Sequence, residues 1–180
     1  MRVTPEKEIP YEDFASRENG RHDFYKREEM QTVFTLNKLS MNFYELYPTS
    51  IYTEIEYKPE RPYIVMVVEI DGNRFALPFR TNIRHNYCYK FKNSGRETQS
   101  STGIDFTKAV IVNDDSYIGE ATTIDNREYV ELMNKFYFIV SKFKQYLNGY
   151  KKYRKFGGDE FLARKYRFTT LKYFERELEI

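Results

Sequence analysis

One short segment of the chain gathers several kinds of reactive side chain directly after a predicted buried strand. Residues 77–85 (LPFRTNIRH) hold two guanidinium groups, a hydroxyl, an amide and an imidazole within six residues. Arg80 and Arg84 could stabilise charge developing on a phosphodiester, and the Thr81 hydroxyl or the His85 imidazole could transfer protons. These groups predict metal-independent RNA cleavage by attack of the 2′-OH on the adjacent phosphorus. The alternative is an ordinary turn, in which the polar side chains bond to the backbone and the arginines are solvated.

Two residues from neighbouring segments could join this cluster. Tyr63 opens the strand before the cluster and could offer its phenol to a phosphate, although an aromatic packed in the core is the alternative. Lys108 precedes another short apolar stretch and could reach the same sheet edge, or could form a surface pair with Asp105. The only histidine besides His85 is His22, which lies in the charged N-terminal segment. A site with one histidine is therefore more economical than a two-histidine acid/base pair.

Several common cofactor and metal sites are excluded by the sequence. There is no P-loop, no GxGxxG fingerprint, no HExxH and no EF-hand loop. The single cysteine, Cys88, excludes an intrachain disulfide and a multi-cysteine zinc site. Asp114 and Asp115 are adjacent in a predicted turn, where neighbouring carboxylates do not converge on one metal ion. We expect no cofactor, no metal site and no two-metal nuclease chemistry.

Basic residues are concentrated in two blocks, although the formal net charge is only +2. Residues 74–96 carry six Lys or Arg and no acid, and their cations alternate with aromatic residues. Residues 135–172 carry eleven Lys or Arg against two acids. Such mixtures can neutralise phosphates and stack bases, whereas the alternative is that the cations solvate helix surfaces. The candidate RNA-binding residues are Arg61, Tyr87, Tyr89, Lys90, Lys92, Lys108, Lys151, Lys152, Arg154 and Lys155.

The surrounding pattern predicts an α+β fold in which an antiparallel sheet positions these residues. Predicted strands cover 31–36, 61–70, 74–79, 86–91 and 109–112, with a hairpin turn at Asp71 and Gly72. Asn37 is expected to cap a helix that ends near Tyr47. Asp125, with Glu128 three residues later, is expected to cap a long helix. Its apolar stripe, most simply core, is Tyr129, Leu132, Phe136, Ile139 or Val140, Phe143, Leu147 and Tyr150. A last helix is expected from Thr169 or Thr170, with Leu171, Phe174 and Leu178 facing inward.

Length and hydropathy predict one domain with an extension. Residues 1–30 are charged and lack periodicity, so we expect an N-terminal extension followed by a single domain over 31–180. No stretch has the roughly 20 apolar residues of a membrane span, and no signal peptide is recognisable. A cytoplasmic location without membrane association is expected. Most of the 17 Tyr and 15 Phe residues should build the core.

Five segments in order resemble a known family. They are KPERPYIVMVVEIDG (58–72), FALPFRTNIRHNY (75–87), TGIDFTKAVIV (102–112), EYVEL (128–132) and TTLKYFERELEI (169–180). Together they resemble the toxins of type III toxin–antitoxin systems, and among these the TenpN-like toxins, which are related to ToxN and AbiQ. The resemblance covers residues 31–180.

The resemblance implies a strongly twisted antiparallel sheet with helices, similar to MazF-like and ToxN-like toxins. It implies a sequence-preferring, metal-independent endoribonuclease, a hydrolase-type nuclease whose products end in 2′,3′-cyclic phosphate. Its partners would be cellular or phage RNA and a small repeat-derived pseudoknot RNA, which inhibits the toxin and is processed by it in a toxin–RNA hetero-oligomer. Release would cause growth arrest as antiviral defence by abortive infection.

The family motif places individual roles on this sequence. The active-site hydroxyl falls on Thr81. Relatives such as ToxN have a lysine where this sequence has Ile83 and Arg84. Because arginine stays charged, we expect Arg84 to stabilise the transition state and His85, Tyr63 or a neighbour of Thr81 to move the proton.

Two other classes of function use the same sequence features. A non-catalytic RNA-binding module would use the same basic and aromatic surface without turnover. A protein-interaction domain would dock its basic helix on an acidic partner.

Overall fold

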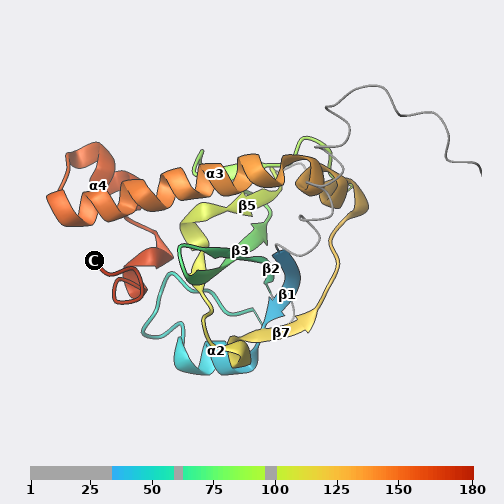
Figure 1. Cartoon of the computed structure of the whole chain (residues 1–180), viewed down its shortest axis with the longest axis horizontal. Helices are drawn as coiled ribbons and strands as arrows, with labels where there is room; N and C mark the ends of the chain where they lie inside the picture. Colours follow the sequence, from blue (N-terminus) through green and yellow to red (C-terminus); the bar gives the residue numbers. More distant parts are fainter. Residues whose placement is uncertain (1–33, 59–62, 96–100) are drawn as a thin grey trace, which may run out of the picture. The chain divides into compact units, whose positions relative to one another are not determined.

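The computed structural model describes residues 34–58, 63–95 and 101–180, and the prediction for residues 1–30 lies outside this part (Figure 1). The described chain is α+β, with seven strands in one antiparallel sheet and three α-helices, as predicted. The strands are β1 (Phe34–Leu39), β2 (Ile64–Ile70), β3 (Asn73–Arg80), β4 (Cys88–Lys90), β5 (Gly103–Asp105), β6 (Val110–Ile111) and β7 (Ile118–Ala121). The helices are α2 (Met41–Leu46), α3 (Asn126–Phe156) and α4 (Glu160–Tyr166), with 3-10 turns η1 (Phe106–Lys108), η2 (Asp115–Tyr117) and η3 (Thr170–Tyr173).

The centre of the sheet is the predicted β2–β3 hairpin. Asp71 and Gly72 form its turn with φ angles of 51° and 78°, the left-handed conformation that a tight hairpin requires. The strand order is β4-β5-β3-β2-β1-β7. The hairpin turn and both of its strands were therefore predicted correctly.

The second edge of β3 is shared by two short strands. β5 pairs with Phe79 and Arg80, and β6 pairs with Phe75 and Ala76, so η1 interrupts the ladder between them. β4 then pairs with β5 and forms the edge of the sheet. The end of β3 is therefore enclosed by η1 and by the loop that leads to β4.

The long helix α3 covers one face of the sheet. Asp125 caps it by accepting from the backbone N–H groups of Arg127 and Glu128, as the sequence predicts. Phe143 packs edge-on against Phe75 of β3, with ring centroids 5.2 Å apart. The expected stripe is buried with one exception, since Tyr129 is 40% exposed and the buried position of that turn belongs to Glu128.

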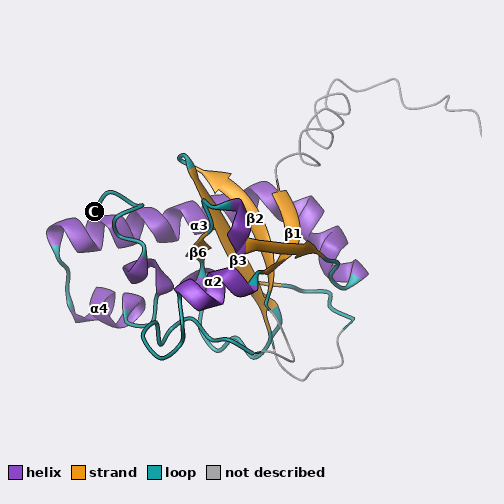
Figure 2. Cartoon of the chain, turned by 90° about the horizontal axis from the view of Figure 1, so that it is seen from below, coloured by secondary structure: helices purple, strands orange, loops and turns teal. Residues whose placement is uncertain are grey.

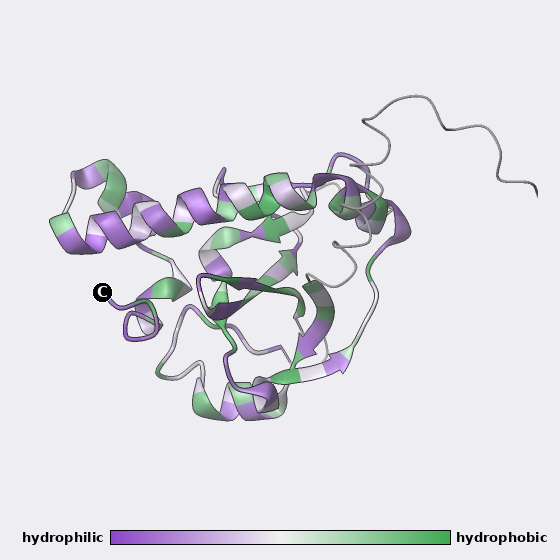
Figure 3. Cartoon of the chain, in the orientation of Figure 1, coloured by the Kyte–Doolittle hydropathy of each residue, from purple (hydrophilic) through white to green (hydrophobic). Residues whose placement is uncertain are grey.

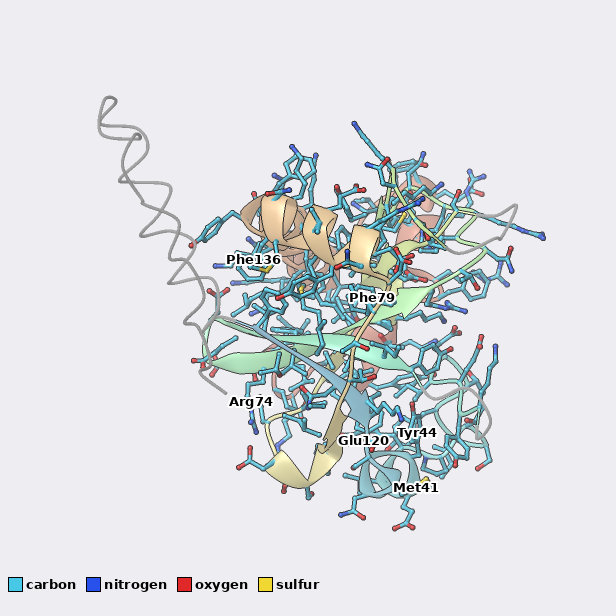
Figure 4. The ribbon with its side chains drawn as sticks, turned by 90° about the vertical axis from the view of Figure 1, so that its right-hand side faces the viewer. Met41, Tyr44, Arg74, Phe79, Glu120 and Phe136 are labelled. Carbon is cyan, nitrogen blue, oxygen red and sulfur yellow. The ribbon has the colours of Figure 1, made fainter. Side chains whose placement is uncertain are left out.

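The opposite face carries α2, and Figure 4 shows Phe136 and Tyr44 on opposite sides of the sheet. Two cap predictions need correction. Ser40, not Asn37, caps α2, because Asn37 still pairs within β1. The predicted last helix is only the 3-10 turn η3, capped by Thr169, although Leu171, Phe174 and Leu178 are buried as expected.

The remaining views add the distribution of loops and of polarity. Figure 2 shows α2 and long loop segments on the side of the sheet away from α3. In Figure 3 the C-terminal half of α3 is largely hydrophilic, in keeping with its predicted basic block. No helix among the described residues is long and apolar enough to cross a membrane.

Candidate functional site

The predicted cluster lies at the end of β3, where Arg80 points to the face of the sheet away from α3 and the His85 ring stacks on Tyr87, which contacts Tyr146 of α3. Phe75 and Phe79 point toward the α3 side, so alternation along the strand places Pro78 and Arg80 on the other face. Val65 pairs with Pro78, and two residues earlier Tyr63 lies beside Arg80. The hairpin therefore brings the predicted Tyr63 and Arg80 side chains together.

Asp105 is the buried centre of the cluster. Its carboxylate accepts from Arg80 Nη1 at 3.1 Å and from the backbone N–H and hydroxyl of Thr107 at 2.9 and 2.6 Å, and His85 Nε2 lies 3.4 Å from it. Its side chain is 1% exposed. Burial raises the pKa of Asp105, but the hydrogen bonds from His85 and Thr107 and the Arg80 charge outweigh it and lower the pKa overall. Asp105 is therefore ionised at neutral pH and fully hydrogen-bonded.

Glu56 is a second carboxylate in the cluster, and it reaches solvent. It accepts from Tyr63 Oη at 3.1 Å, lies 3.6 Å from Arg80 Nη2 and pairs with Lys58 at 3.0 Å. Partial burial raises its pKa, but the Lys58 hydrogen bond and the Arg80 charge lower it overall. Burial raises the pKa of Tyr63 to about 12, and although the charge of Arg80 lowers it, that of Glu56 raises it further. Tyr63 is thus a neutral donor and Glu56 an ionised acceptor.

The imidazole of His85 is held by both of its nitrogens. Nε2–H points to Asp105, and Nδ1 accepts from the backbone N–H of Tyr87 at 3.2 Å. The Tyr87 ring stacks on it, with centroids 6.0 Å apart. This arrangement fixes the tautomer with the proton on Nε2 and makes Nδ1 the nitrogen with a lone pair.

The turn between Arg80 and His85 is held by its apolar residue. Ile83 is buried, and its N–H donates to the Ser101 carbonyl at 3.2 Å. Asn82 adopts a left-handed φ of 60°. Within the described part of the chain, the side chains of Thr81, Asn82 and Arg84 make no hydrogen bond or ion pair. Among the described residues the backbone bonds of Thr81 and Asn82 in our alternative interpretation are therefore not seen, whereas the exposed Arg84 fits its solvated arginines and is equally available to a ligand.

The other predicted RNA-binding residues differ in exposure and in whether they form ion pairs. Lys108 is only 15% exposed and pairs with Glu54 at 2.7 Å and with the Phe168 carbonyl at 3.1 Å, so the alternative pair with Asp105 is not formed. Arg154 pairs with Glu175 through Nε at 2.6 Å and Nη2 at 3.2 Å. Arg61 lies outside the described residues. The exposed candidates are Lys90, Lys92, Lys152 and Lys155, and the half-buried ones are Lys151, Tyr87 and Tyr89.

Sequence reasoning missed both carboxylates. Asp105 carried a weak local signal, because Asp is a favoured N-cap residue, and here it caps η1 by accepting from the Thr107 N–H. Glu56 carried none, since it lies in a loop seven residues before Tyr63. The cluster is therefore less basic than the sequence of 77–85 indicates.

The arrangement suits acid/base chemistry on a phosphodiester: one cation between two carboxylates, an imidazole and a neutral phenol. Among the described residues, no group of three or more His, Cys, Asp or Glu side chains is placed to hold a metal ion. Comparison with protein-family models, with curated proteins and with solved structures finds no match. The resemblance to type III toxins therefore stays a prediction from the quoted segments.

Proposed function

We propose that this chain is a metal-independent endoribonuclease that acts at the end of β3. The observation that carries the proposal is the unbroken chain of contacts through Tyr63, Glu56, Arg80, Asp105 and His85. It joins an acceptor, a cation and an imidazole at one exposed edge. These are the groups that 2′-OH attack requires when no metal ion takes part.

Glu56 is the proposed general base. Its side chain is 38% exposed and ionised, so it can accept the proton of the 2′-OH as that oxygen attacks the adjacent phosphorus. Arg80 is positioned to stabilise the charge on the phosphoryl oxygens, and Arg84, which is exposed and has no ion pair among the described residues, can add to this stabilisation in the transition state. Once Glu56 has taken the proton of the 2′-OH, the Tyr63 hydroxyl can turn from Glu56 and donate its hydrogen bond to the phosphate.

His85 is the proposed general acid. Asp105 holds Nε2–H, so Nδ1 is the nitrogen that delivers a proton to the departing 5′-oxygen. Protonated Nδ1 no longer accepts from the Tyr87 N–H, and substrate binding has to displace that 3.2 Å contact. The P–O5′ bond breaks as the P–O2′ bond forms, leaving a 2′,3′-cyclic phosphate and a 5′-hydroxyl.

The biological role proposed is that of a cytoplasmic toxin of a type III toxin–antitoxin system. It is supported by the five resembling segments, which also favour a MazF-like or ToxN-like fold, a pseudoknot RNA that inhibits the toxin and is processed by it, and growth arrest during phage infection. Tandem short repeats followed by a terminator directly upstream of the coding sequence would support it. If such repeats are absent, the toxin–antitoxin role is contradicted while the proposed nuclease activity is unaffected.

The deciding experiment incubates the pure protein with RNA in EDTA. Products ending in 2′,3′-cyclic phosphate are expected, and both Glu56→Gln and His85→Ala should abolish them while RNA still binds. Glu69→Gln is the matched control, because Glu69 is exposed on β2 at a distance from the cluster along the strand. No cleavage, or cleavage only after magnesium is added, would overturn the proposal.

A second candidate, a non-catalytic RNA-binding module, has one observation in its favour. The charge of Arg80 is already met by Asp105 and Glu56, whereas Lys90, Lys92 and Arg84 remain exposed. That function predicts salt-dependent binding with no products in the same EDTA assay.

A further inference from the structure

The loop after β4 is latched to the start of α3 by a row of acids. Glu131 accepts from the Tyr89 hydroxyl at 2.7 Å and from the N–H groups of Lys92 and Asn93, each at 3.0 Å. One turn earlier Glu128 accepts from the Ser94 hydroxyl at 2.7 Å, and Asp125 accepts from the Gly95 N–H at 3.1 Å. Four successive loop residues are thus held by acids spaced three residues apart on α3.

The latch leaves the outward side of this junction basic. The groove between the loop and α3 is lined by Lys92, Arg127 and Lys135, by the amides Asn93 and Asn134, and by Tyr89. Within the described part of the chain, the cationic and amide side chains of this set form no hydrogen bond or ion pair. Glu131 is the acid of the groove, and both of its oxygens are occupied by the donors of the latch. Three unpaired cations therefore face solvent beside unsatisfied amides.

An exposed aromatic ring adjoins the groove. Phe138 lies on α3 one turn beyond Asn134 and is 52% exposed. The Tyr89 ring meets it edge-on, with centroids 6.3 Å apart, and Lys142 Nζ lies 5.5 Å from its centroid. A half-exposed ring fixed by a second aromatic and flanked by a cation is a stacking platform.

We infer that this groove binds single-stranded RNA, with a base on Phe138 and phosphates on Lys92, Arg127 and Lys135. Cations suit phosphates, amides suit base edges, and the ring suits a planar base. An acidic peptide would satisfy only the cations. The inference rests on the proposed function in naming RNA as the ligand.

The edge strand β4 connects this groove to the catalytic cluster. Tyr89 and Lys90 are successive residues, so Tyr89 faces α3 while Lys90 lies on the face of Arg80. Among the strands of the described residues, β4 has no partner on its outer side. An RNA strand that crosses this edge can therefore contact the groove and the cluster together, which would make the groove a determinant of where the RNA is cut.

The chain has no tryptophan, which allows a direct test of stacking. Phe138→Trp introduces one fluorophore, and a saturable quench is expected when a 2′-O-methyl RNA oligonucleotide, which cannot be cleaved, is added. Phe168→Trp is the matched control, because Phe168 is also exposed, at 56%, with the Arg167 guanidinium 5.1 Å from its ring centroid, and neither residue belongs to the groove or to the candidate RNA-binding residues. An equal quench in both variants, or none in Phe138→Trp, would overturn the inference.

Charge removal gives a second readout that does not depend on cleavage. Arg127→Gln and Lys135→Gln should each reduce the slope of log K against log salt by about 0.7, the value for one phosphate contact on a single strand. Lys144→Gln should leave the slope unchanged, since Lys144 lies on the same helix but outside the groove.

Polyglutamate should not quench the introduced tryptophan, and a quench by polyglutamate but not by RNA would assign the groove to an acidic protein. Failure of the EDTA cleavage assay would leave these binding results standing, so the two proposals fail separately.

Discussion

Asp105 holds the cluster together at the scale of a single residue. It is buried, caps η1 and receives hydrogen bonds from side chains on both sides of the β3 turn. The same carboxylate therefore positions His85, the proposed general acid, and Arg80, the proposed stabiliser of charge on the phosphate. Asp114 offers a natural comparison, because it caps η2 through the Ser116 N–H but is exposed.

We expect Asp105→Asn to lower the free energy of unfolding by about 2 kcal/mol at pH 7, since it weakens hydrogen bonds to charged groups. The folded-state pKa of Asp105 is lowered, so its contribution is complete above the ordinary pKa and is lost as pH falls through the folded value. The gap between wild type and variant should thus narrow below about pH 4. Urea unfolding at pH 7 and pH 3 measures it, with Asp114→Asn as the exposed control. An equal gap at both pH values would contradict this account.

Substitutions of Arg80 and Arg84 should distinguish effects on protein stability from effects on RNA cleavage. Arg80 pairs with Asp105 and Glu56, whereas Arg84 is exposed and has no ion pair in the described chain. Arg84→Gln is expected to reduce RNA cleavage about 100-fold, as for loss of one transition-state donor, without changing the urea midpoint. Arg80→Gln should lower both. A shifted midpoint in Arg84→Gln would show that Arg84 has a structural role instead.

The members of the cluster that could be predicted from the sequence lie near one another along the chain or on paired strands of one hairpin. Arg80, Thr81 and His85 share one turn, and Tyr63 follows from the register of the β2–β3 hairpin. Asp105 arrives through the pairing of β5 with β3, a long-range contact that no local pattern determines. For the same reason the neutralisation of Arg80 was not foreseen.

At the scale of elements, the latch between the β4 loop and α3 has a tightly packed point at Gly95. A Cβ atom there would overlap Asp125 Oδ2 and lie 3.2 Å from Asp125 Cγ. Gly95→Ala should therefore displace the side chain that caps α3 and lower the free energy of unfolding by about 1 kcal/mol, the usual cost of a lost cap. In an Asp125→Ala background the same substitution should cost less, because the overlapping atoms are gone. Additive costs in urea unfolding would contradict the proposed overlap.

The elements with a clear local pattern were predictable, whatever their length. A capping pair and a seven-residue apolar stripe predicted α3, and β-branched residues around a tight turn predicted β2 and β3. The strands β4 and β6 have only three and two residues but lie inside the predicted strands 86–91 and 109–112. By contrast, β5, β7 and α4 were missed because their segments show no clear apolar period. Tyr129 was predicted to face inward because it is the apolar residue nearest the position one turn before Leu132. That buried position is occupied by Glu128, whose side chain bonds to Ser94 of the loop, and Tyr129 is exposed.

Across the whole molecule, buried and half-buried tyrosines link its layers. Tyr47 lies at the end of α2, Tyr63 beside the cluster, and Tyr166 in α4 against α3, where it stacks with Tyr153. Burial raises the pKa of each to about 12; the charge of Glu177 adds to this at Tyr47, that of Glu56 at Tyr63, and interaction with Tyr87 at Tyr166. The tyrosine-rich composition thus contributes to the core, and ionisation of these tyrosines should destabilise the fold at alkaline pH.

These raised values predict that alkaline ionisation of the three tyrosines accompanies unfolding. A group whose folded pKa exceeds its ordinary value of about 10 stabilises the fold fully below that pH and loses its contribution as pH rises toward 12. Absorbance at 295 nm should therefore show Tyr47, Tyr63 and Tyr166 ionising only as the far-ultraviolet circular dichroism signal is lost. Tyr166→Phe should shrink the part of the absorbance change that coincides with this loss. Complete ionisation of the tyrosines near pH 10 with intact secondary structure would show that the aromatic core is open to water.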